Sequence, residues 1–499
     1  MYGTGLCRHV YTRTRLHRSR VQWGDRSIRQ SEGTSAAVAE QEPIVAPKLS
    51  KRERGRLKQR RESDPREEVT LTVQSMAHGG AALGRVEGRV GLIDYAIAGE
   101  EVRAVVRRGK RDYFEAEAFE VLQAAPERVT PPCPYFGPCG GCQWQHIDYA
   151  AQLRFKRAVV EEQLRRIGGL TLEVAAVHSA APWHYRHSAA IALGHAAGFR
   201  SRHSRWEIEI KECMISHPAI SNLMNDLNGL ITREEIVNFR GKLWLEVKVV
   251  HPTGRTDEPT IQAILKGIAG VDPEDNADIQ AALERIAALP SVWSLAFRRA
   301  KGGTETVKGP LNGSVLVAGR SYQLPAGSFF QTNLELLPQL LARVEALAAP
   351  YRNGTIADLY CGVGLFALWL AQGSPDTALV GIEVDPLAIA AAEETARQWS
   401  VENCRFVARP AEKALSELPE VDLVIVDPPR SGLDEKLLRA LIERGPQGFV
   451  YVSCEPSTLA RDLAILTAGG YTVQSVEMFD FFPQTYHVES LAFLTKAIG

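Results

Sequence analysis

The sequence contains no apolar run long enough to cross a membrane. Runs such as residues 423–426 are short and flanked by charged residues, whereas a membrane-spanning helix needs about 20 apolar residues. Internal repeats and long low-complexity tracts are also lacking. The 499 residues, 45% hydrophobic and 23% charged, have the ordinary composition of a protein with several globular domains. An integral membrane protein is therefore excluded.

An excess of charge of one sign is lacking as well, because 58 Lys and Arg residues are balanced by 59 Asp and Glu residues. This balance hides an asymmetry, since residues 1–66 carry 16 basic and 7 acidic side chains, a net charge of +9. Few apolar residues separate these charges, so we expect a disordered arm that attracts phosphate groups. A solvated tail is the alternative, and the absence of acids from residues 1–24 leaves a transit peptide open.

Residues 67–125 have the pattern of a small β-barrel that resembles an OB-like fold. Short β-rich runs, separated by glycine pairs and charged residues, are typical of such a barrel. The runs are residues 69–73, 88–93, 101–106 and 113–119. Five basic residues on them favour nucleic-acid binding, although a solvated face has the same composition. They are Arg103, Arg107, Arg108, Lys110 and Arg111.

The rest of the chain predicts two further domains. Residues 126–315 contain an amphipathic helix at residues 150–167 and mixed signals that indicate a central domain. In residues 316–499 strand and helix signals alternate, which predicts an α/β domain with a parallel sheet and right-handed crossovers. The expected strands are residues 356–361, 379–384, 404–407, 422–426 and 449–454, with helices at residues 387–399 and 435–442.

The first strand of this sheet leads into a glycine turn suited to a cofactor. Asp358 is followed by Gly362 and Gly364, and the next strand ends in Glu383, which can accept hydrogen bonds from ribose hydroxyls. Because Ala367 completes the dinucleotide pattern, a nicotinamide or flavin oxidoreductase remains open. The position of Asp358 and the Asp-Pro-Pro-Arg run at residues 427–430 favour S-adenosylmethionine instead. A structural turn without any ligand is a third reading.

Two residues near the C-terminus are candidates for chemistry. Cys454 ends the fifth strand, and Pro456 then opens a helix whose positive N-terminus would favour the thiolate. Glu489 lies at the start of the last strand, where partial desolvation would suit a proton acceptor. Taken alone, Cys454 can equally be a packing residue, and Glu489 can be a partner in a strand-edge salt bridge.

Five runs in fixed order resemble the RNA 5-methyluridine methyltransferases. They are Gln-Thr-Asn at residues 331–333, Asp-Leu-Tyr-Cys-Gly-Val-Gly at 358–364, Asp-Pro-Pro-Arg at 427–430, Ser-Cys-Glu-Pro-Ser at 453–457 and His-Val-Glu at 487–489. The resemblance extends from about residue 68 to the C-terminus. It implies a class I S-adenosylmethionine-dependent methyltransferase domain of Rossmann-like fold and identifies the barrel as similar to the TRAM RNA-binding domain.

The resemblance assigns roles to residues. It implies that Cys454 adds to C6 of the target uracil and that Glu489 removes the proton from C5. The positions that match the cofactor-binding residues of the family are Gln331, Tyr360, Gly362, Gly364, Glu383 and Asp427. The target base must leave its stack, so aromatic residues of the loop at residues 479–486 are expected to support it. Two positions depart from the family pattern, Leu365 and Pro410.

Three of the eight cysteines, Cys133, Cys139 and Cys142, lie within ten residues and are separated by prolines and glycines. We recognise no secretory signal, so a metal site is expected rather than disulfides. Spacing alone leaves zinc and an iron–sulfur cluster open. Cys213 and the flanking residues resemble the cluster-bearing branch of the family, which implies a [4Fe-4S] cluster with a structural role.

The resemblance also points to a substrate, because the ribosomal RNA branch carries these cysteines and the transfer RNA branch generally lacks them. The sequence is thus interpreted as a cytoplasmic enzyme that makes 5-methyluridine in large-subunit (23S) ribosomal RNA, with RNA as its partner and neither a membrane nor an obligate protein partner. A transfer RNA substrate is the nearest alternative. An oxidoreductase with a metal cluster and a non-catalytic RNA-binding module are alternatives of other classes.

Overall fold

A computed structural model describes residues 67–497, apart from 203, 205, 240–241, 253–258, 268–275, 300–301 and 416–417. The arm at residues 1–66, with its predicted roles in phosphate binding or import, lies outside the described residues. In the part of the chain that is described, no helix is long and apolar enough to span a membrane.

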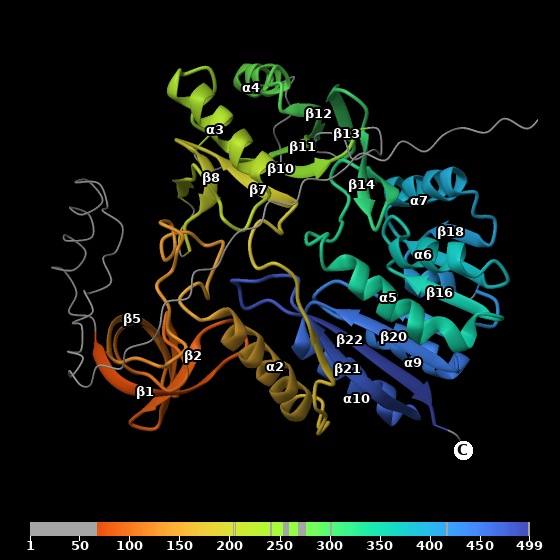
Figure 1. Ribbon diagram of the computed structural model, residues 1–499, viewed down its shortest axis with the longest axis horizontal. Helices are drawn as coiled ribbons and strands as arrows, with labels where there is room; N and C mark the ends of the chain where they lie inside the picture. Colours follow the sequence, from red (N-terminus) through yellow and green to blue (C-terminus); the bar gives the residue numbers. More distant parts are fainter. Residues whose placement is uncertain are drawn as a thin grey trace, which may run out of the picture. The chain divides into compact units, whose positions relative to one another are not determined.

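The first described element is a closed five-stranded barrel with the strand order β1-β2-β3-β5-β4 (Figure 1). Its strands are β1 (Glu68–Met76), β2 (Ala82–Val86), β3 (Arg89–Asp94), β4 (Glu101–Gly109) and β5 (Tyr113–Gln123). In β1, Val69, Leu71 and Val73 point into the barrel and alternate with exposed residues, as one half-buried sheet face requires. The predicted barrel is confirmed, although the sequence pattern missed β2.

Three of the five basic barrel residues singled out for nucleic-acid binding are paired with carboxylates on other strands of the barrel. Cross-strand pairs of opposite charge stabilise a barrel surface and occupy the guanidinium groups that would otherwise contact phosphate. The pairs are Arg103 with Glu68 and Glu120, Arg107 with Asp94 and Glu117, and Arg108 with Glu115. The nucleic-acid role of these arginines stays a prediction, and the ion pairs favour the alternative of a solvated face for the exposed Arg103 and Arg108.

After the barrel, the next helix along the chain is the long α2 (Tyr149–Arg166). It begins at Asp148, whose side chain accepts hydrogen bonds from the first backbone N–H groups. A seven-stranded sheet follows, in the order β13-β12-β11-β10-β7-β8-β9, and α3 (Pro218–Thr232) and α4 (Ala277–Ala287) share its core (Figure 1). Its strands are β7 (Ser188–Leu193), β8 (Ala197–Arg200), β9 (Glu207–Glu209), β10 (Leu243–Val250), β11 (Thr260–Gly267), β12 (Val292–Arg298) and β13 (Thr304–Lys308).

The C-terminal half forms an eight-stranded sheet in the order β18-β17-β16-β19-β20-β22-β21-β6. The strands from β18 to β20 are parallel, as predicted, whereas β22 runs antiparallel to both β20 and β21. Its strands are β6 (Ala176–His178), β16 (Thr355–Leu359), β17 (Ala378–Glu383), β18 (Cys404–Ala408), β19 (Leu423–Val426), β20 (Gly448–Ser453), β21 (Tyr471–Phe479) and β22 (Glu489–Lys496). β6 comes from the segment expected in the central domain, yet it pairs with β21.

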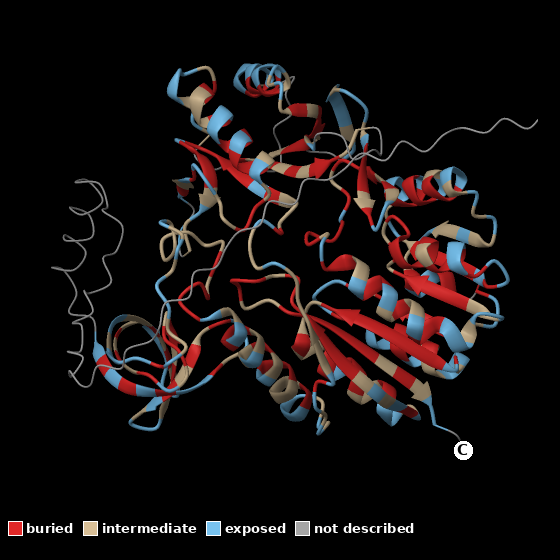
Figure 2. Ribbon diagram, viewed as in Figure 1, coloured by how far each residue is buried: buried red, intermediate tan, exposed pale blue. Residues whose placement is uncertain are grey.

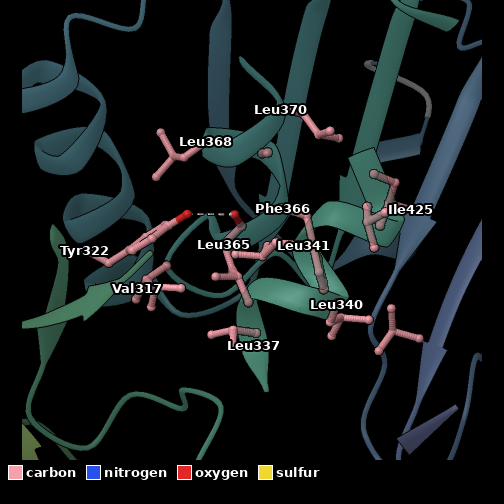
Figure 3. Close-up of a cluster of buried hydrophobic side chains, with 14 of the residues drawn as sticks. Val317, Tyr322, Leu337, Leu340, Leu341, Leu365, Phe366, Leu368, Leu370 and Ile425 are labelled. Atoms are coloured by element: carbon pink, nitrogen blue, oxygen red, sulfur yellow. Dashed lines mark hydrogen bonds between the residues drawn. The ribbon is translucent and has the colours of Figure 1, made fainter. Parts of the chain in front are cut away.

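Helices cover both faces of this sheet, whose central strands β19 and β20 are entirely buried (Figure 2). One face packs against α5 (Leu337–Ala348), α6 (Leu365–Gly373), α7 (Pro386–Trp399) and the hairpin β14 (Asn312–Val317) and β15 (Arg320–Pro325). The other face packs against α2, α8 (Ala411–Ala414), α9 (Glu435–Arg444) and α10 (Pro456–Ala468). In the core on the face covered by α5, α6 and α7, the Tyr322 hydroxyl donates to the Leu365 carbonyl oxygen at 3.3 Å (Figure 3).

Candidate active site

The order of the strands places the candidate site. From β16 the chain proceeds outward through β17 and β18 and then returns to β19 on the other side of β16. Ligands of such sheets bind at the carboxyl ends of the strands where the order reverses. Tyr360, Asp427 and Cys454 follow β16, β19 and β20 directly or within one residue, so the sheet brings these three predicted site residues to one edge.

The turn after β16 is built for close approach of a ligand. Tyr360, Gly362 and Gly364 all have positive φ angles, of 63°, 54° and 80°, which favour glycine over other residues. A methyl group on Gly364 would lie 3.0 Å from the Phe406 ring, whereas one on Gly362 would meet nothing within 4 Å. Gly364 is therefore favoured both by its φ angle and by close packing, and Gly362 leaves its backbone open to a ligand.

Glu383 is held at the end of β17 by three backbone N–H groups. One carboxylate oxygen accepts from Val384 and Asp385 at 2.7 and 2.9 Å, and the other accepts from Gly362 at 3.2 Å. Glu383 also lines a cavity of about 150 Å³ together with Tyr360 and Pro410. This carboxylate is thus fixed beside an open space, as a group that binds ribose hydroxyls must be.

One of the two departures from the family pattern, Leu365, has a structural explanation. Leu365 is the first residue of α6, and its side chain is buried in the core shown in Figure 3. Pro410 precedes α8 and supplies no side-chain hydrogen bond to its first turn. Pro410 and Tyr360 both line the cavity beside Glu383, and there the Tyr360 hydroxyl donates to a Glu412 carboxylate oxygen at 3.2 Å.

Asp358, at the end of β16, is completely buried. One carboxyl oxygen accepts from the Ala367 backbone N–H at 3.0 Å, and the other has no partner among the described residues. Burial, with smaller contributions from Asp427 and Glu383, raises the pKa of this carboxyl to about 8. The free oxygen can accept a hydrogen bond from a ligand that enters the turn.

This raised pKa predicts a pH dependence of stability. Because the folded state binds the Asp358 proton more tightly than the unfolded chain, the free energy of unfolding falls as pH rises from about 4 to about 8. Asp358→Asn is expected to remove this contribution, so that its melting temperature exceeds that of the parent at pH 8 and approaches it near pH 4. Thermal unfolding of both proteins across this range is the measurement, and parallel curves would contradict the prediction.

Gln331 and Asp427 lie together on the opposite side of the turn. The Gln331 amide nitrogen is 3.5 Å from an Asp427 carboxylate oxygen, and the Gln331 side chain is nearly fully buried. Burial raises the pKa of Asp427 to about 7, and the hydrogen bond from Gln331 opposes this rise. Because β16 lies between β17 and β19, the turn that contains Gly362 lies between Glu383 and this pair.

Cys454 and Glu489 face each other across two antiparallel strands. In the pairing of β20 with β22, Ser453 is opposite Ser490, so the next pair in register is Cys454 and Glu489. Residues directly opposite in an antiparallel pair have side chains on the same face. Glu489 is 2% exposed, and one of its carboxyl oxygens has no hydrogen-bond partner among the described residues. Its predicted desolvation is confirmed.

The charge state of this pair differs from the expectation for Cys454. Pro456 does open α10, but burial and the nearby Glu489 and Asp427 raise the pKa of the Cys454 thiol to about 11. Burial and these two carboxyl groups therefore oppose the expected preference for the thiolate in the ligand-free protein. Burial and Asp427 likewise raise the pKa of Glu489 well above its usual value.

Two residues with no predicted role complete the site. The Arg430 guanidinium hydrogen-bonds to Cys454 and lowers the pKa of its thiol, and it also lowers the pKa of Glu489. The Arg430 Nη2 atom is 3.4 Å from Nδ1 of His487. Burial and Arg430 lower the pKa of His487 to about 4. Arg430 ends the run at residues 427–430 and His487 begins the run at residues 487–489. Their places in these two runs were the sequence signal that could have identified them as site residues.

The loop at residues 479–487 is held by contacts with Lys156 of α2. Lys156 and Asp480, both fully buried, form an ion pair of 2.6 Å, and Lys156 also donates to the Phe482 carbonyl oxygen at 3.0 Å. Of the aromatic residues expected to support the target base, Phe479 and Phe481 are completely buried in the core, so the expectation is wrong for these two. Phe482 remains a candidate, since it lines a cavity next to His487.

The four predicted metal ligands, Cys133, Cys139, Cys142 and Cys213, line one cavity of about 610 Å³ that also reaches Arg430 and His487. The Gly141 backbone N–H lies 3.4 Å from the Cys139 sulfur, and the Ser216 hydroxyl lies 3.3 Å from the Cys213 sulfur. Among the described residues, no three His, Cys, Asp or Glu side chains are grouped closely enough to hold a metal ion. The cysteines share a cavity, and their role as ligands stays a prediction.

The sequence profile described as tRNA (uracil-5-)-methyltransferase matches residues 148–497. The chain belongs to this family. Uncharacterized RNA methyltransferases of Halalkalibacterium halodurans and Aquifex aeolicus are 33% and 34% identical to it, over 85% of this chain in both cases and over 96% and 98% of their own lengths. A solved structure, the Pyrococcus abyssi tRNA (uracil-54, C5)-methyltransferase in complex with S-adenosyl-L-homocysteine, is 25% identical with a TM-score of 0.64 and covers 86% of this chain and 100% of its own.

This RNA uracil-5-methyltransferase is therefore an S-adenosylmethionine-dependent enzyme, as the resemblance implied. The residues present fit that cofactor, because Gly362 is open, Glu383 is fixed beside a cavity and Asp358 has an unpartnered buried oxygen. The family match decides against the dinucleotide-dependent oxidoreductase and against a non-catalytic RNA-binding module.

Proposed function

We propose that this enzyme methylates C5 of a uridine in large-subunit ribosomal RNA through a covalent bond between Cys454 and C6 of the uracil. The observation that supports this chemistry is the register of β20 and β22, which sets Cys454 opposite the buried carboxyl of Glu489. A nucleophile and a proton acceptor beside the cofactor edge of the sheet are the groups that covalent catalysis requires.

The proposed steps follow from the reactivity of uracil. Carbon C5 is a poor nucleophile until the Cys454 thiol gives up its proton to solvent and its sulfur adds to C6, which moves the electrons of the C5–C6 double bond toward O4 as an enolate. Bound S-adenosylmethionine would supply the methyl group: its sulfur–methyl bond breaks as the C5–methyl bond forms, and S-adenosyl-L-homocysteine is the leaving group. Glu489 then takes the proton from C5, and the bond between C6 and Cys454 breaks as the double bond is restored. One proton is released overall.

Arg430 has a clear task in this scheme. Its guanidinium group hydrogen-bonds to the Cys454 thiol and lowers the pKa of both Cys454 and Glu489, so it favours the charged forms that addition and proton removal require. Glu489 and Asp427 oppose it, because they raise the pKa of the thiol. The resting site thus holds Cys454 mainly as the thiol, and Arg430 favours formation of the thiolate against the effect of burial.

The choice of RNA rests on the cysteines that resemble the ribosomal RNA branch. A transfer RNA uridine is the second candidate, because the Pyrococcus abyssi structure is of a tRNA (uracil-54, C5)-methyltransferase. The test is mass spectrometry of 5-methyluridine in separately purified large-subunit rRNA and tRNA from a gene-deletion strain and its parent. Loss from rRNA alone is expected, whereas loss from tRNA alone would overturn the substrate assignment.

We further propose that Cys133, Cys139, Cys142 and Cys213 hold a [4Fe-4S] cluster with a structural role. The support for this proposal is the donor set alone, since four thiols of two distant segments line one cavity, and thiolates are the ligands that such clusters prefer. Methyl transfer involves no redox step, so the cluster would fasten the segment after the barrel to the central domain.

Cys213→Ser is expected to lower the iron and sulfide content of the purified protein and to reduce its melting temperature. The reason is that a cluster binds the folded state alone, so losing a ligand removes binding energy that stabilises the fold. Iron and acid-labile sulfide assays with thermal unfolding are the measurements, and Cys404→Ser, in β18, is the matched control. A parent protein that contains zinc and no sulfide would overturn the cluster in favour of zinc.

A further inference from the structure

A loop of the N-terminal barrel contacts the segment that carries the nucleophile. Residues 77–81, which we call the barrel loop, join β1 to β2 and are closed by a hydrogen bond of 2.8 Å from the Ala77 N–H to the Ala81 carbonyl oxygen. Gly79 and Gly80 both have φ angles near 90°, which only glycine adopts readily. The loop thereby presents His78 to the catalytic domain.

His78 pairs with the residue directly after Cys454. Its Nε2 atom lies 2.8 Å from a carboxylate oxygen of Glu455, and the two side chains are 33% and 20% exposed. Glu455 is the N-cap of α10, and the same carboxylate oxygen accepts from the Ser457 hydroxyl at 2.7 Å. Its backbone N–H donates to the Ser453 hydroxyl at 3.2 Å. Glu455 therefore fixes the junction between β20 and α10 in which Cys454 lies.

The barrel loop also touches the segment that leads to Glu489. A methyl group on Gly80 would lie 2.6 Å from the Tyr486 ring, so the loop backbone packs tightly against that ring. The Gly80 carbonyl oxygen accepts from the Trp144 indole N–H at 2.8 Å, which holds the loop in place. Tyr486 in turn lies against His487, with ring centroids 4.2 Å apart. One loop thus contacts the segments next to both Cys454 and Glu489.

We propose that the barrel loop is part of the catalytic apparatus and that His78, through Glu455, is a positioning residue for Cys454. This inference rests on the proposed role of Cys454 as nucleophile. The short distance between the groups supports the inference, because the Glu455 side chain alone connects His78 to the backbone of the residue that follows Cys454. A misplacement of a reacting atom by about 1 Å can lower a rate by about a hundredfold, so a contact that holds this junction affects the chemical step.

The test uses the full-length protein with RNA that contains 5-fluorouridine at the target position, because such RNA stops at the covalent adduct. Under single-turnover conditions with saturating RNA, His78→Ala is expected to form the adduct about tenfold more slowly, as expected for loss of a hydrogen bond to a charged group. The dissociation constant for RNA is expected to stay unchanged. His78→Gln keeps an N–H donor and is expected to restore most of the rate.

His195→Ala is the matched control, because His195 forms a similar pair of 2.9 Å with Glu207 in the central sheet; its rate is expected to equal that of the parent. In a Glu455→Ala background, His78→Ala is expected to have no further effect. An unchanged adduct rate in His78→Ala, or a slower rate that saturating RNA fully restores, would overturn the positioning role. Absence of the adduct in the parent protein would instead overturn the proposed nucleophile.

Discussion

Cys454→Ala is expected to abolish both methylation and adduct formation with 5-fluorouridine RNA. Without the sulfur nothing adds to C6, so C5 never gains the electron density needed for methyl transfer. A loss of at least about 10⁴-fold is expected, in the range seen when covalent nucleophiles are removed. The measurement is transfer of a labelled methyl group to RNA, together with a denaturing gel that separates free protein from the adduct.

Cys404→Ser is the matched control for this experiment too, since Cys404 is a half-buried cysteine in β18 outside the site, and it should retain both activities. RNA affinity should be similar in the parent and in Cys454→Ala, because the thiol is small and its removal leaves the RNA-binding surface intact. Substantial methylation by Cys454→Ala would refute the covalent route while leaving the family membership untouched.

Glu489→Gln is expected to give the opposite result on the gel, namely a covalent adduct with ordinary uridine RNA. Cys454 can still add and C5 can still be methylated, but the C5 proton is not removed and elimination of Cys454 stalls. Turnover should fall by about 10²- to 10⁴-fold, the usual contribution of a general base. Glutamine resembles the protonated carboxyl that burial favours at this position, so the fold is expected to tolerate the change.

The accumulated adduct should contain the methyl group, which a labelled methyl donor detects on the gel. The double variant Cys454→Ala with Glu489→Gln provides the control and should show no adduct. If Glu489→Gln turned over like the parent, another group would be the base. If it failed to form any adduct, even with 5-fluorouridine RNA, Glu489 would be needed for addition rather than for proton removal.

The sequence predicted the parts of the fold that depend on local patterns. Alternation of strands and helices located β16 to β20, and the residues at their carboxyl ends lie together because parallel strands end at one edge. The glycine turn at residues 362–364 was also predicted from a local pattern, because two glycines directly follow a predicted strand. Its positive φ angles show why glycine stands there. The assignment of Cys454 and Glu489 came from the resemblance, and it stays a proposal.

The missed features depend on contacts between distant segments. β6 has three residues and pairs with a strand about 300 positions later, so no local pattern marks it. The raised pKa of Cys454 arises from its neighbours Glu489 and Asp427 in space. Aromatic residues of one loop divide between core and cavity according to packing, which is why Phe481 and Phe482 have different surroundings despite being adjacent.

The buried pair of Lys156 and Asp480 constrains the order in which the chain can fold. The two residues are separated by 324 positions, so Lys156 emerges from the ribosome long before its partner is synthesised. A buried ammonium group without its carboxylate destabilises a fold by about 3–5 kcal/mol. The helix that carries Lys156 is therefore expected to dock stably only after Asp480 has been synthesised, and the loop beside His487 is expected to close late in folding. Chains truncated before Asp480 are expected to be substrates for proteolysis rather than partly active enzymes.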